Sequence, residues 1–337
     1  MKKTRINKFA AFFCAFVLLF SFSACASVNS DGGDISIVCT AFPQYDWLRN
    51  ILGDMEGYSI TLLVDNGSDL HSYQPTVADR AEIAECDILV TIGGESDAWA
   101  EKMVGDSKKT RLVRLFDVPN ITLREVSEEG VMSEHIHEDS HEEHDHEHEH
   151  DHEHEHDHGA YDEHIWLSLK NAKACVEYFK DILTELSPDD MQTLSKNADE
   201  YISKIVALES EYEALTHSKE PKRLIFADRF PFAYLTADLE IEYCAAFSGC
   251  STENNADFST ITRLAERMLE WKTIYLFVTE TSNGRLANGI IAAAKADGAE
   301  ILTLDSMQSL TRARMTAGED YLSIMRSNLG VLRKALS

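Results

Sequence analysis

Histidine is the residue type best suited to chemistry in this chain, and it is unevenly distributed. The chain has 337 residues and 14 His. Imidazoles alternating with carboxylates form a dense set of nitrogen and oxygen ligands, and neutral imidazole suits Zn, Cu and Ni. We therefore expect a weak, multi-site metal collector. Its eleven histidines are His135, His137, His141, His144, His146, His148, His150, His152, His154, His156 and His158.

The segment around these histidines, residues 125–163, holds 17 acidic residues and no Lys or Arg. Such a segment cannot bury apolar surface, so it predicts a mobile surface loop. A solvated charged linker is the alternative, but a linker needs only Asp and Glu. The metal capacity of the loop should fall as the pH drops toward ~6.5, where imidazole protonates.

A preformed metal site needs three or four ligands on rigid elements, so the three other histidines matter most. His71 stands in Gly-Ser-Asp-Leu-His-Ser-Tyr-Gln-Pro, just after a predicted strand. His164 stands in Asp-Glu-His-Ile-Trp-Leu, directly ahead of a predicted helix. His217 ends a long predicted helix, where a positive charge is favourable against the helix dipole, and that structural role suffices. His71 and His164 are therefore the candidate ligands.

Composition limits the function classes. The chain has 31 Lys and Arg against 58 Asp and Glu, a net charge of -27, which argues against binding nucleic acid phosphates. A hydrophobic content of 44% excludes a wholly disordered chain. The length corresponds to about two domains.

The N-terminus reads as an export signal. Four basic residues precede an almost wholly apolar run over residues 9–22, which is short of the ~20 residues of a membrane span. We expect residues 1–24 to be a signal peptide, whose removal takes the net charge from -27 to -31. Ser-Ala-Cys at its end resembles a bacterial lipobox, although Phe22 replaces the usual aliphatic residue. This predicts lipidation of Cys25 and anchoring by the acyl chains; a free Cys25 beside an ordinary cleavage site is the alternative.

Five further cysteines remain in the exported chain, an odd number that leaves at least one thiol unpaired. An exported protein can form disulfides, but the sequence does not assign the pairing. These residues are Cys39, Cys86, Cys175, Cys244 and Cys250.

The elements that must position these residues form two α/β sets, one within residues 25–186 and one within residues 219–337. In each set, apolar β-branched runs alternate with helical patterns, which implies a parallel sheet with helices on both faces. The first set predicts strands at 36–41, 59–64, 88–92 and 111–116, and helices at 43–52 and 76–84. The second predicts strands at 223–227, 240–247, 273–278 and 300–304, and helices at 258–271, 285–296 and 319–336.

Residues 187–218 join the two sets. Apolar residues recur there every three or four positions from Met191 to Leu215, which predicts one long helix with a single apolar stripe. Ser-Pro-Asp at 187–189 is a helix-start signal, and a coiled coil is the competing interpretation. The fold class is thus α/β, with two lobes, each a mainly parallel sheet flanked by helices, joined by one long rigid α-helix.

Taken together, these motifs resemble the solute-binding lipoproteins of bacterial ABC importers for zinc and manganese, the cluster A-I metal-binding family. The resemblance rests on residues 67–75, with Leu70 where Pro is common, and on residues 162–167, with Glu163 replacing Pro. It extends to Thr-Ala-Phe-Pro-Gln-Tyr-Asp-Trp at 40–47, to the Gly-Gly-Glu turn at 93–95, to the His-rich loop just before His164, and to the long helix. It covers essentially the whole exported chain.

The resemblance implies a ligand set with two members from each lobe: His71, His164, Asp228 and Asp305. Zinc-specific relatives place a His where Asp228 stands, whereas manganese-type relatives place a carboxylate. Asp228 could instead cap a helix, and Asp305 could be a turn residue. His71, Asp228 and Asp305 each follow a predicted strand, at the sheet edges where open α/β sheets bind ligands. Glu280, whose family counterpart is structural, is left out, and Asp162 or Glu163 is expected to orient His164.

The resemblance also implies the function: extracytoplasmic capture of Zn²⁺ and its delivery to an ABC permease. The protein would be a monomer and not an enzyme, lipid-anchored to the outer face of the bacterial cytoplasmic membrane. Mn²⁺ or iron is the alternative cargo, although affinity ordering favours Zn²⁺ over Mn²⁺. A metal-buffering or adhesive surface lipoprotein is a further alternative. A zinc hydrolase would need an open coordination position and a general base, and every His-Glu-x-x-His match, such as His137 to His141, falls in the His-rich loop rather than on a predicted helix.

Overall fold

A computed structural model describes residues 34–105, 109–127, 130–132, 161–216, 221–250 and 256–336. Residues Ile35–Ser337 form one compact unit, to which the description below refers. The predicted signal peptide, the lipidation site Cys25, the eleven histidines of the His-rich loop and His217 lie outside the described residues.

The first lobe is built on a four-stranded parallel sheet with strand order β2-β1-β3-β4. Its strands start and end within three residues of the predicted runs. They are β1 (Ile35–Cys39), β2 (Tyr58–Leu62), β3 (Ile88–Thr91) and β4 (Arg111–Arg114). Its helices are α2 (Phe42–Leu52), α3 (Val77–Glu85) and the unpredicted α4 (Ala98–Val104).

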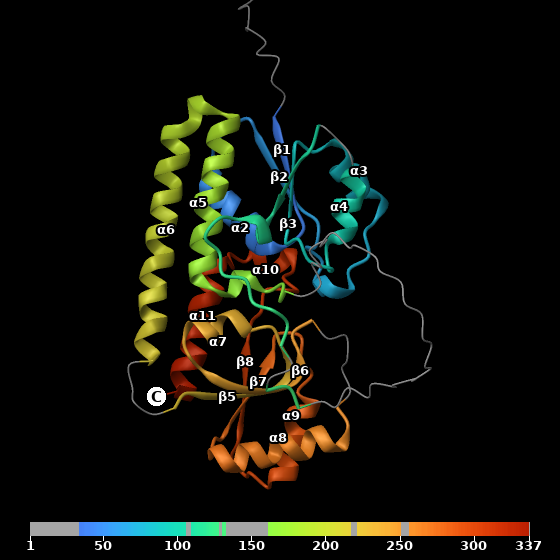
Figure 1. The fold of residues 1–337 in the computed structure, drawn as a ribbon, viewed down its shortest axis with the longest axis vertical. Helices are drawn as coiled ribbons and strands as arrows, with labels where there is room; N and C mark the ends of the chain where they lie inside the picture. The colour runs from blue at the N-terminus through green and yellow to red at the C-terminus, as the bar shows by residue number, and fades with distance from the viewer. Residues whose placement is uncertain are drawn as a thin grey trace, which may run out of the picture. The chain divides into compact units, whose positions relative to one another are not determined.

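The second lobe repeats this topology, with a parallel sheet in the order β6-β5-β7-β8. Its strands are β5 (Arg223–Phe230), β6 (Glu242–Ser248), β7 (Tyr275–Thr279) and β8 (Glu300–Leu304). Its helices are α7 (Ala233–Asp238), α8 (Phe258–Trp271), α9 (Arg285–Ala294), α10 (Arg312–Thr316) and α11 (Tyr321–Leu336). The predicted two-lobed α/β fold is confirmed (Figure 1).

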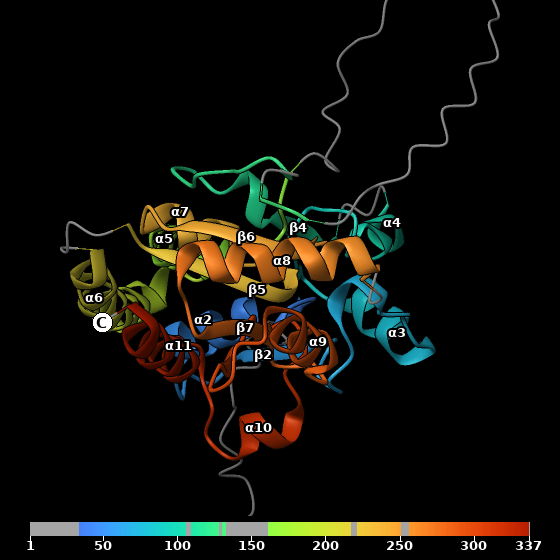
Figure 2. The same ribbon diagram turned by 90° about the horizontal axis from the view of Figure 1, so that it is seen from below.

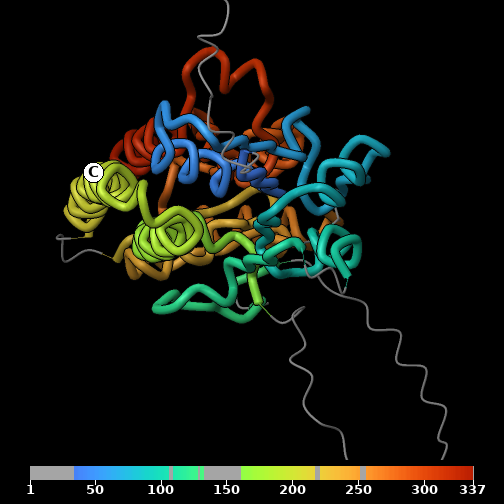
Figure 3. Tube along the Cα trace, turned by 90° about the horizontal axis from the view of Figure 1, so that it is seen from above, coloured from blue at the N-terminus to red at the C-terminus, as the bar shows by residue number. Residues whose placement is uncertain are grey.

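Two helices, α5 (Leu169–Leu186) and α6 (Met191–Glu213), follow the first sheet and precede the second along the chain, and they pack side by side (Figure 1). The long helix α6 leads from the first lobe into β5, and its buried residues follow the predicted apolar stripe from Leu194 to Tyr212. Helix α11 packs beside α6, as the view from above shows (Figure 3). The last helix of the chain therefore packs against the long helix that joins the two lobes.

Alternating strand residues divide the core into three layers, because successive side chains point to opposite faces of a sheet. In β1, Val38 packs with an outer cluster that includes α3 and α4, whereas Ile37 joins the central core. In β5, Ile225 packs with α8 and α9, whereas Phe226 joins the same central core. Helices α8 and α9 thus cover the outer face of the second sheet (Figure 2). Both lobes share one central core, which restricts motion between them.

Within the described residues, no helix combines the length and apolar character needed to cross a membrane. The five described cysteines, Cys39, Cys86, Cys175, Cys244 and Cys250, form no disulfide with one another.

Candidate metal centre

His71 sits in a short 3₁₀ turn, η1 (Leu70–Ser72), beyond the carboxyl end of β2. Asp69 begins this turn, and its Oδ1 accepts a hydrogen bond from the His71 backbone N–H at 2.9 Å. The other Asp69 oxygen pairs with Arg229 of β5, which ties the turn to the second lobe. Buried Leu70 anchors the turn in the central core. These contacts fix the place of His71 in the fold.

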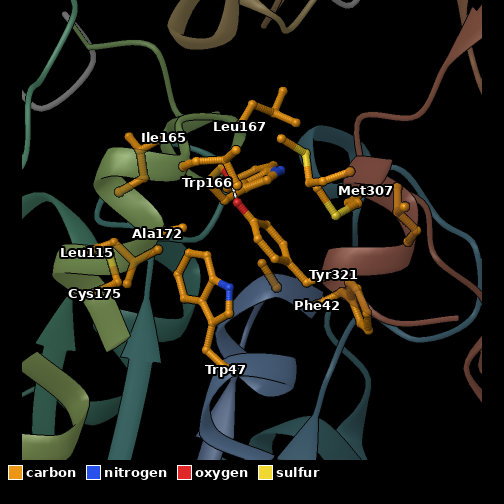
Figure 4. Packing of buried hydrophobic residues seen from close by; sticks show 14 of the residues in the cluster. Phe42, Trp47, Leu115, Ile165, Trp166, Leu167, Ala172, Cys175, Met307 and Tyr321 are labelled. Carbon is orange, nitrogen blue, oxygen red and sulfur yellow. Dashed lines mark hydrogen bonds between the residues drawn. The ribbon is translucent and has the colours of Figure 1, made fainter. Parts of the chain in front are cut away.

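His164 is fully buried and directly precedes the turn η4 (Ile165–Leu167). Asp162 Oδ1 accepts from the His164 backbone N–H at 2.9 Å and lies 2.8 Å from His164 Nδ1. The turn is anchored from the second lobe: Trp166 Nε1 donates to the Ser306 carbonyl at 2.8 Å, and the Tyr321 hydroxyl donates to the Trp166 carbonyl at 2.7 Å (Figure 4). Asp162 thus makes the orienting contact expected of Asp162 or Glu163.

The two histidines meet through their Nε2 atoms, which lie 3.1 Å apart. The Asp162 carboxylate accepts the proton on His164 Nδ1, so His164 Nε2 carries a lone pair. The His71 tautomer that carries its proton on Nε2 donates to this lone pair. Two Nε2 ligands of a tetrahedral zinc ion, at about 2.05 Å from the metal, would stand about 3.3 Å apart. The pair is therefore already at nearly the spacing that one zinc ion needs.

The surroundings keep His71 neutral. Burial first, and then the neighbouring His164, lower the pKa of His71 from its ordinary value to about 4, although the Glu163 and Asp69 carboxylates oppose the shift. Glu163 Oε2 lies 3.8 Å from His71 Nδ1. Ser96 holds this carboxylate through its backbone N–H and its hydroxyl. Glu163 thus stands where it can accept the His71 Nδ1 proton when Nε2 binds a metal.

Cys250 joins the two histidines. The ligand atoms of His71, His164 and Cys250 all lie within 4.8 Å of one another, and no other group of three such residues is found within the described part of the chain. Cys250 follows β6, two residues beyond its last member Ser248. Burial first, and then the Asp162 and Glu163 carboxylates, raise the pKa of the Cys250 thiol well above its ordinary value. The thiol is therefore protonated in the absence of a metal.

Gln308 closes another side of the cluster. It follows β8, is buried, and places its amide Nε2 against His164 Nε2. The Gln308 amide nitrogen and His71 Nε2 thus compete for the one lone pair of His164 Nε2. Because the oxygen and nitrogen of a glutamine amide can exchange places by rotation, Gln308 offers this position either a donor or an acceptor.

The predicted ligand Asp228 is engaged elsewhere. We expected it just past a strand ending at residue 227, but this boundary is wrong because β5 continues to Phe230. Asp228 therefore lies within the strand, where its Oδ2 accepts from the Thr279 hydroxyl at 2.8 Å and from the Thr279 backbone N–H at 3.2 Å. It does not join the His pair, and its role as a ligand stays a prediction.

Asp305 does follow β8, as expected, but both of its oxygens have partners. Oδ1 accepts from the Met307 backbone N–H at 2.8 Å, and Oδ2 pairs with Arg314 of α10. Its role as a ligand likewise stays a prediction. Glu280 holds Ser306 through the backbone N–H at 2.8 Å and through the hydroxyl, a structural role.

The sequence analysis overlooked Cys250 and Gln308 as site residues. Both carry the signal that led to His71, a polar side chain shortly after the carboxyl end of a predicted strand. Cys250 was considered only for disulfide pairing, and Gln308 lies three residues beyond the carboxylate that drew attention. The arrangement offers nitrogen and sulfur donors to one ion, and these donors suit zinc better than manganese, which favours carboxylate, carbonyl and water oxygens.

Known proteins resemble this chain along nearly its whole length. The family model described as "Zinc-uptake complex component A periplasmic" matches residues 37–335. Zinc-binding lipoprotein AdcA of Streptococcus pneumoniae is 30% identical over 99% of this chain, which spans only 61% of that relative's length. High-affinity zinc uptake system protein ZnuA of Bacillus subtilis is 27% identical over 92% of this chain and 90% of that protein.

A solved structure adds support for the fold. The Zn(II)-bound ZnuA-like domain of S. pneumoniae AdcA superimposes with a TM-score of 0.69 at 25% identity, covering 90% of this chain and 99% of that domain. Together with the family match over most of the chain, this similarity shows that the chain belongs to the ZnuA family of zinc-uptake complex components.

Proposed function

We propose that this chain captures Zn²⁺ outside the cytoplasm and delivers it to an ABC permease for import. The observation that carries the proposal is the pair of buried Nε2 atoms of His71 and His164, 3.1 Å apart. Both imidazoles are held by backbone and carboxylate contacts, so little ordering is needed when an ion arrives. The names of the relatives AdcA and ZnuA support zinc as the cargo.

The two-lobed arrangement suits capture and release. One histidine follows β2 and the other precedes α5, while the second lobe closes over them through the Asp69–Arg229 ion pair. A second ion pair, between Asp65 and Arg312 of α10, also links the lobes. The Asp65–Arg312 pair, whose Arg312 side chain is exposed, costs only about 0–1 kcal/mol to break, whereas the Asp69–Arg229 pair is largely buried. Because the shared core restricts motion between the lobes, we expect release to involve local movement around these two ion pairs.

The remaining parts of the proposal rest on the sequence. Lipidation of Cys25 would hold the protein at the outer face of the bacterial cytoplasmic membrane, and the lipoprotein relatives support this location. The eleven histidines between residues 133 and 158 would collect metal ions at low affinity. The protein would act as a monomer and catalyse no reaction.

Competition with a chromogenic chelator tests the metal site. The exported chain from residue 26 is titrated with Zn²⁺ and, separately, with Mn²⁺. Deleting residues 133–158 should remove weak sites and keep one tight zinc site. His71→Ala should weaken tight binding at least ~10-fold, or about 1.4 kcal/mol, whereas the control His217→Ala should not.

Three results would count against the proposal. Loss of the tight site on loop deletion would show that the loop supplies an essential ligand. Unchanged affinity in His71→Ala would remove the His pair from the site. Tighter binding of Mn²⁺ than Zn²⁺ would change the cargo. Delivery is tested by growth of the source organism in zinc-depleted medium, where the His71→Ala chain should fail to replace the native one.

A further inference from the structure

We propose that Cys250 is the second lobe's ligand to the captured ion, so that the ion is held by two imidazoles and one thiolate. This inference rests on the proposed capture of metal at the His71–His164 pair and specifies the chemistry of its cargo. The cargo class is a borderline-soft divalent cation, such as Zn²⁺, rather than a hard one such as Mn²⁺.

Geometry supports a three-residue site. In a tetrahedral zinc site with Zn–N of about 2.05 Å and Zn–S of about 2.3 Å, the nitrogen and sulfur atoms stand about 3.6 Å apart. The Cys250 Sγ already lies within 4.8 Å of both histidine ligand atoms. A movement of about 1 Å, within the range of a side-chain rotation or a small loop shift, completes the arrangement.

Gly249 provides a separate observation that the Cys250 loop is fitted to His164. A Cβ atom at this position would stand 2.7 Å from the Phe230 carbonyl oxygen and 3.2 Å from His164 Cε1. Only a glycine lets the backbone come this close, and no positive φ explains its presence. The residue before Cys250 therefore packs directly against the His164 ring. This contact keeps the Cys250 thiol close to the two histidines.

The carboxylates that could compete for this role are engaged. Asp228 is held by Thr279 on the neighbouring strand β7, and Asp305 by Arg314 on α10. Recruiting either one would break hydrogen bonds already made in the second lobe. The Cys250 thiol is held only by the Glu163 backbone, which belongs to the site itself, so it is the second-lobe donor closest to the two histidines among the described residues.

Charge also fits a thiolate. Zn²⁺ with one thiolate and two neutral imidazoles leaves one net positive charge. The Asp162 and Glu163 carboxylates lie beside the histidines, at 2.8 Å from His164 Nδ1 and 3.8 Å from His71 Nδ1. Their two negative charges more than offset that positive charge without binding the metal. Gln308 borders the remaining coordination position, which the amide or a water molecule can fill.

Cobalt substitution tests the proposal in the exported chain from residue 26, which keeps the whole compact unit Ile35–Ser337. One equivalent of Co²⁺ should give a near-ultraviolet sulfur-to-cobalt charge-transfer band. The His-rich loop cannot produce this band, because the chain has no cysteine between Cys86 and Cys175. Cys250→Ala should abolish the band, whereas the matched control Cys244→Ala, which removes a buried thiol from the preceding strand β6, should retain it.

Affinity provides the second readout. Cys250→Ala should weaken Zn²⁺ binding at least ~10-fold and change Mn²⁺ binding much less. If Cys250→Ala does not fold, alkylation of the unaltered chain still gives a test. One equivalent of Zn²⁺ should slow the alkylation of Cys250 in the folded chain but not in the same chain unfolded by denaturant. Mass spectrometry identifies which cysteine is alkylated.

The outcomes separate this inference from the proposed function. Tight zinc binding with no charge-transfer band, or with a band that survives in Cys250→Ala, would overturn the thiolate ligand and leave the capture of zinc standing. Alkylation of Cys250 at an unchanged rate in the zinc-loaded chain would do the same. Absence of tight zinc binding in the unaltered chain would instead overturn the proposed function.

Discussion

Replacing Asp162 with Asn should weaken zinc binding by about 10- to 100-fold, although Asp162 is not itself a proposed ligand. Its Oδ1 accepts from both the backbone and Nδ1 of His164, at 2.9 and 2.8 Å. These contacts set the orientation of the ring and direct its lone pair toward the ion. Asparagine keeps the size of the side chain and one acceptor oxygen but removes the negative charge.

The magnitude follows from two losses. A hydrogen bond to a charged group contributes about 1.5–3 kcal/mol, against about 0.5–1.5 kcal/mol for a neutral one, so the bond itself loses about 1–1.5 kcal/mol. Removing a carboxylate beside a buried Zn²⁺ adds a further electrostatic loss of similar size. Together they amount to about 2–3 kcal/mol, which corresponds to the upper part of the 10- to 100-fold range in Kd expected when the partner of a metal-binding histidine is lost. The backbone of residue 162 should stay in place, because Tyr234 donates to its carbonyl oxygen at 2.8 Å.

A chelator competition at fixed pH, repeated in a double-mutant cycle with His164→Ala, measures this effect. If Asp162 acts by orienting His164, then Asp162→Asn should have little further effect in the His164→Ala background. Circular dichroism of the metal-free proteins checks that both variants fold. A zinc affinity for Asp162→Asn within about two-fold of the unaltered chain would refute the argument, as would a full and additive effect in the double variant.

Two further predictions concern stability. Burial raises the pKa of the Asp46 carboxyl from 3.8 to about 6, so the folded chain binds this proton more tightly than the unfolded chain, and stability present below pH ~4 is lost as the pH rises through ~6. Asp46→Asn should remove up to about 3 kcal/mol of this loss. Urea unfolding of the metal-free protein should therefore show the variant gaining stability relative to the unaltered chain between pH ~4 and ~6.5, and a constant difference over this range would contradict the assignment. Gly94→Ala would place a Cβ 2.4 Å from Glu163 Oε1 and should therefore lower the free energy of unfolding by about 1–3 kcal/mol in the same assay. An unchanged unfolding midpoint would contradict this prediction and show that the Glu163 carboxylate can move aside.

Strand and helix periodicity predicted most of the fold. The boundaries of α8 match the predicted helix at both ends, and the buried face of α6 matches the predicted stripe. The helices α4, α7 and α10 escaped prediction because each has seven residues or fewer, too few for a 3.6-residue period to show.

The site was predictable in part. Motif context singled out His71 and His164, and the structure brings them together. Sequence spacing does not reveal that β5 extends to Phe230, which places Asp228 inside the strand and against Thr279. It also does not reveal α10, whose Arg314 engages Asp305. The proximity of Cys250 to the histidines depends on the packing of both lobes around one core, and that information is not local.

Anomalous diffraction at the zinc absorption edge, from crystals of the exported chain loaded with one equivalent of Zn²⁺, tests the central claim most directly. The account predicts one principal peak about 2.0–2.1 Å from the Nε2 atoms of both His71 and His164, and about 2.3 Å from the sulfur of Cys250. A principal peak on Asp228 or Asp305 without the two histidines, or zinc spread over surface sites with none at the His pair, would contradict it.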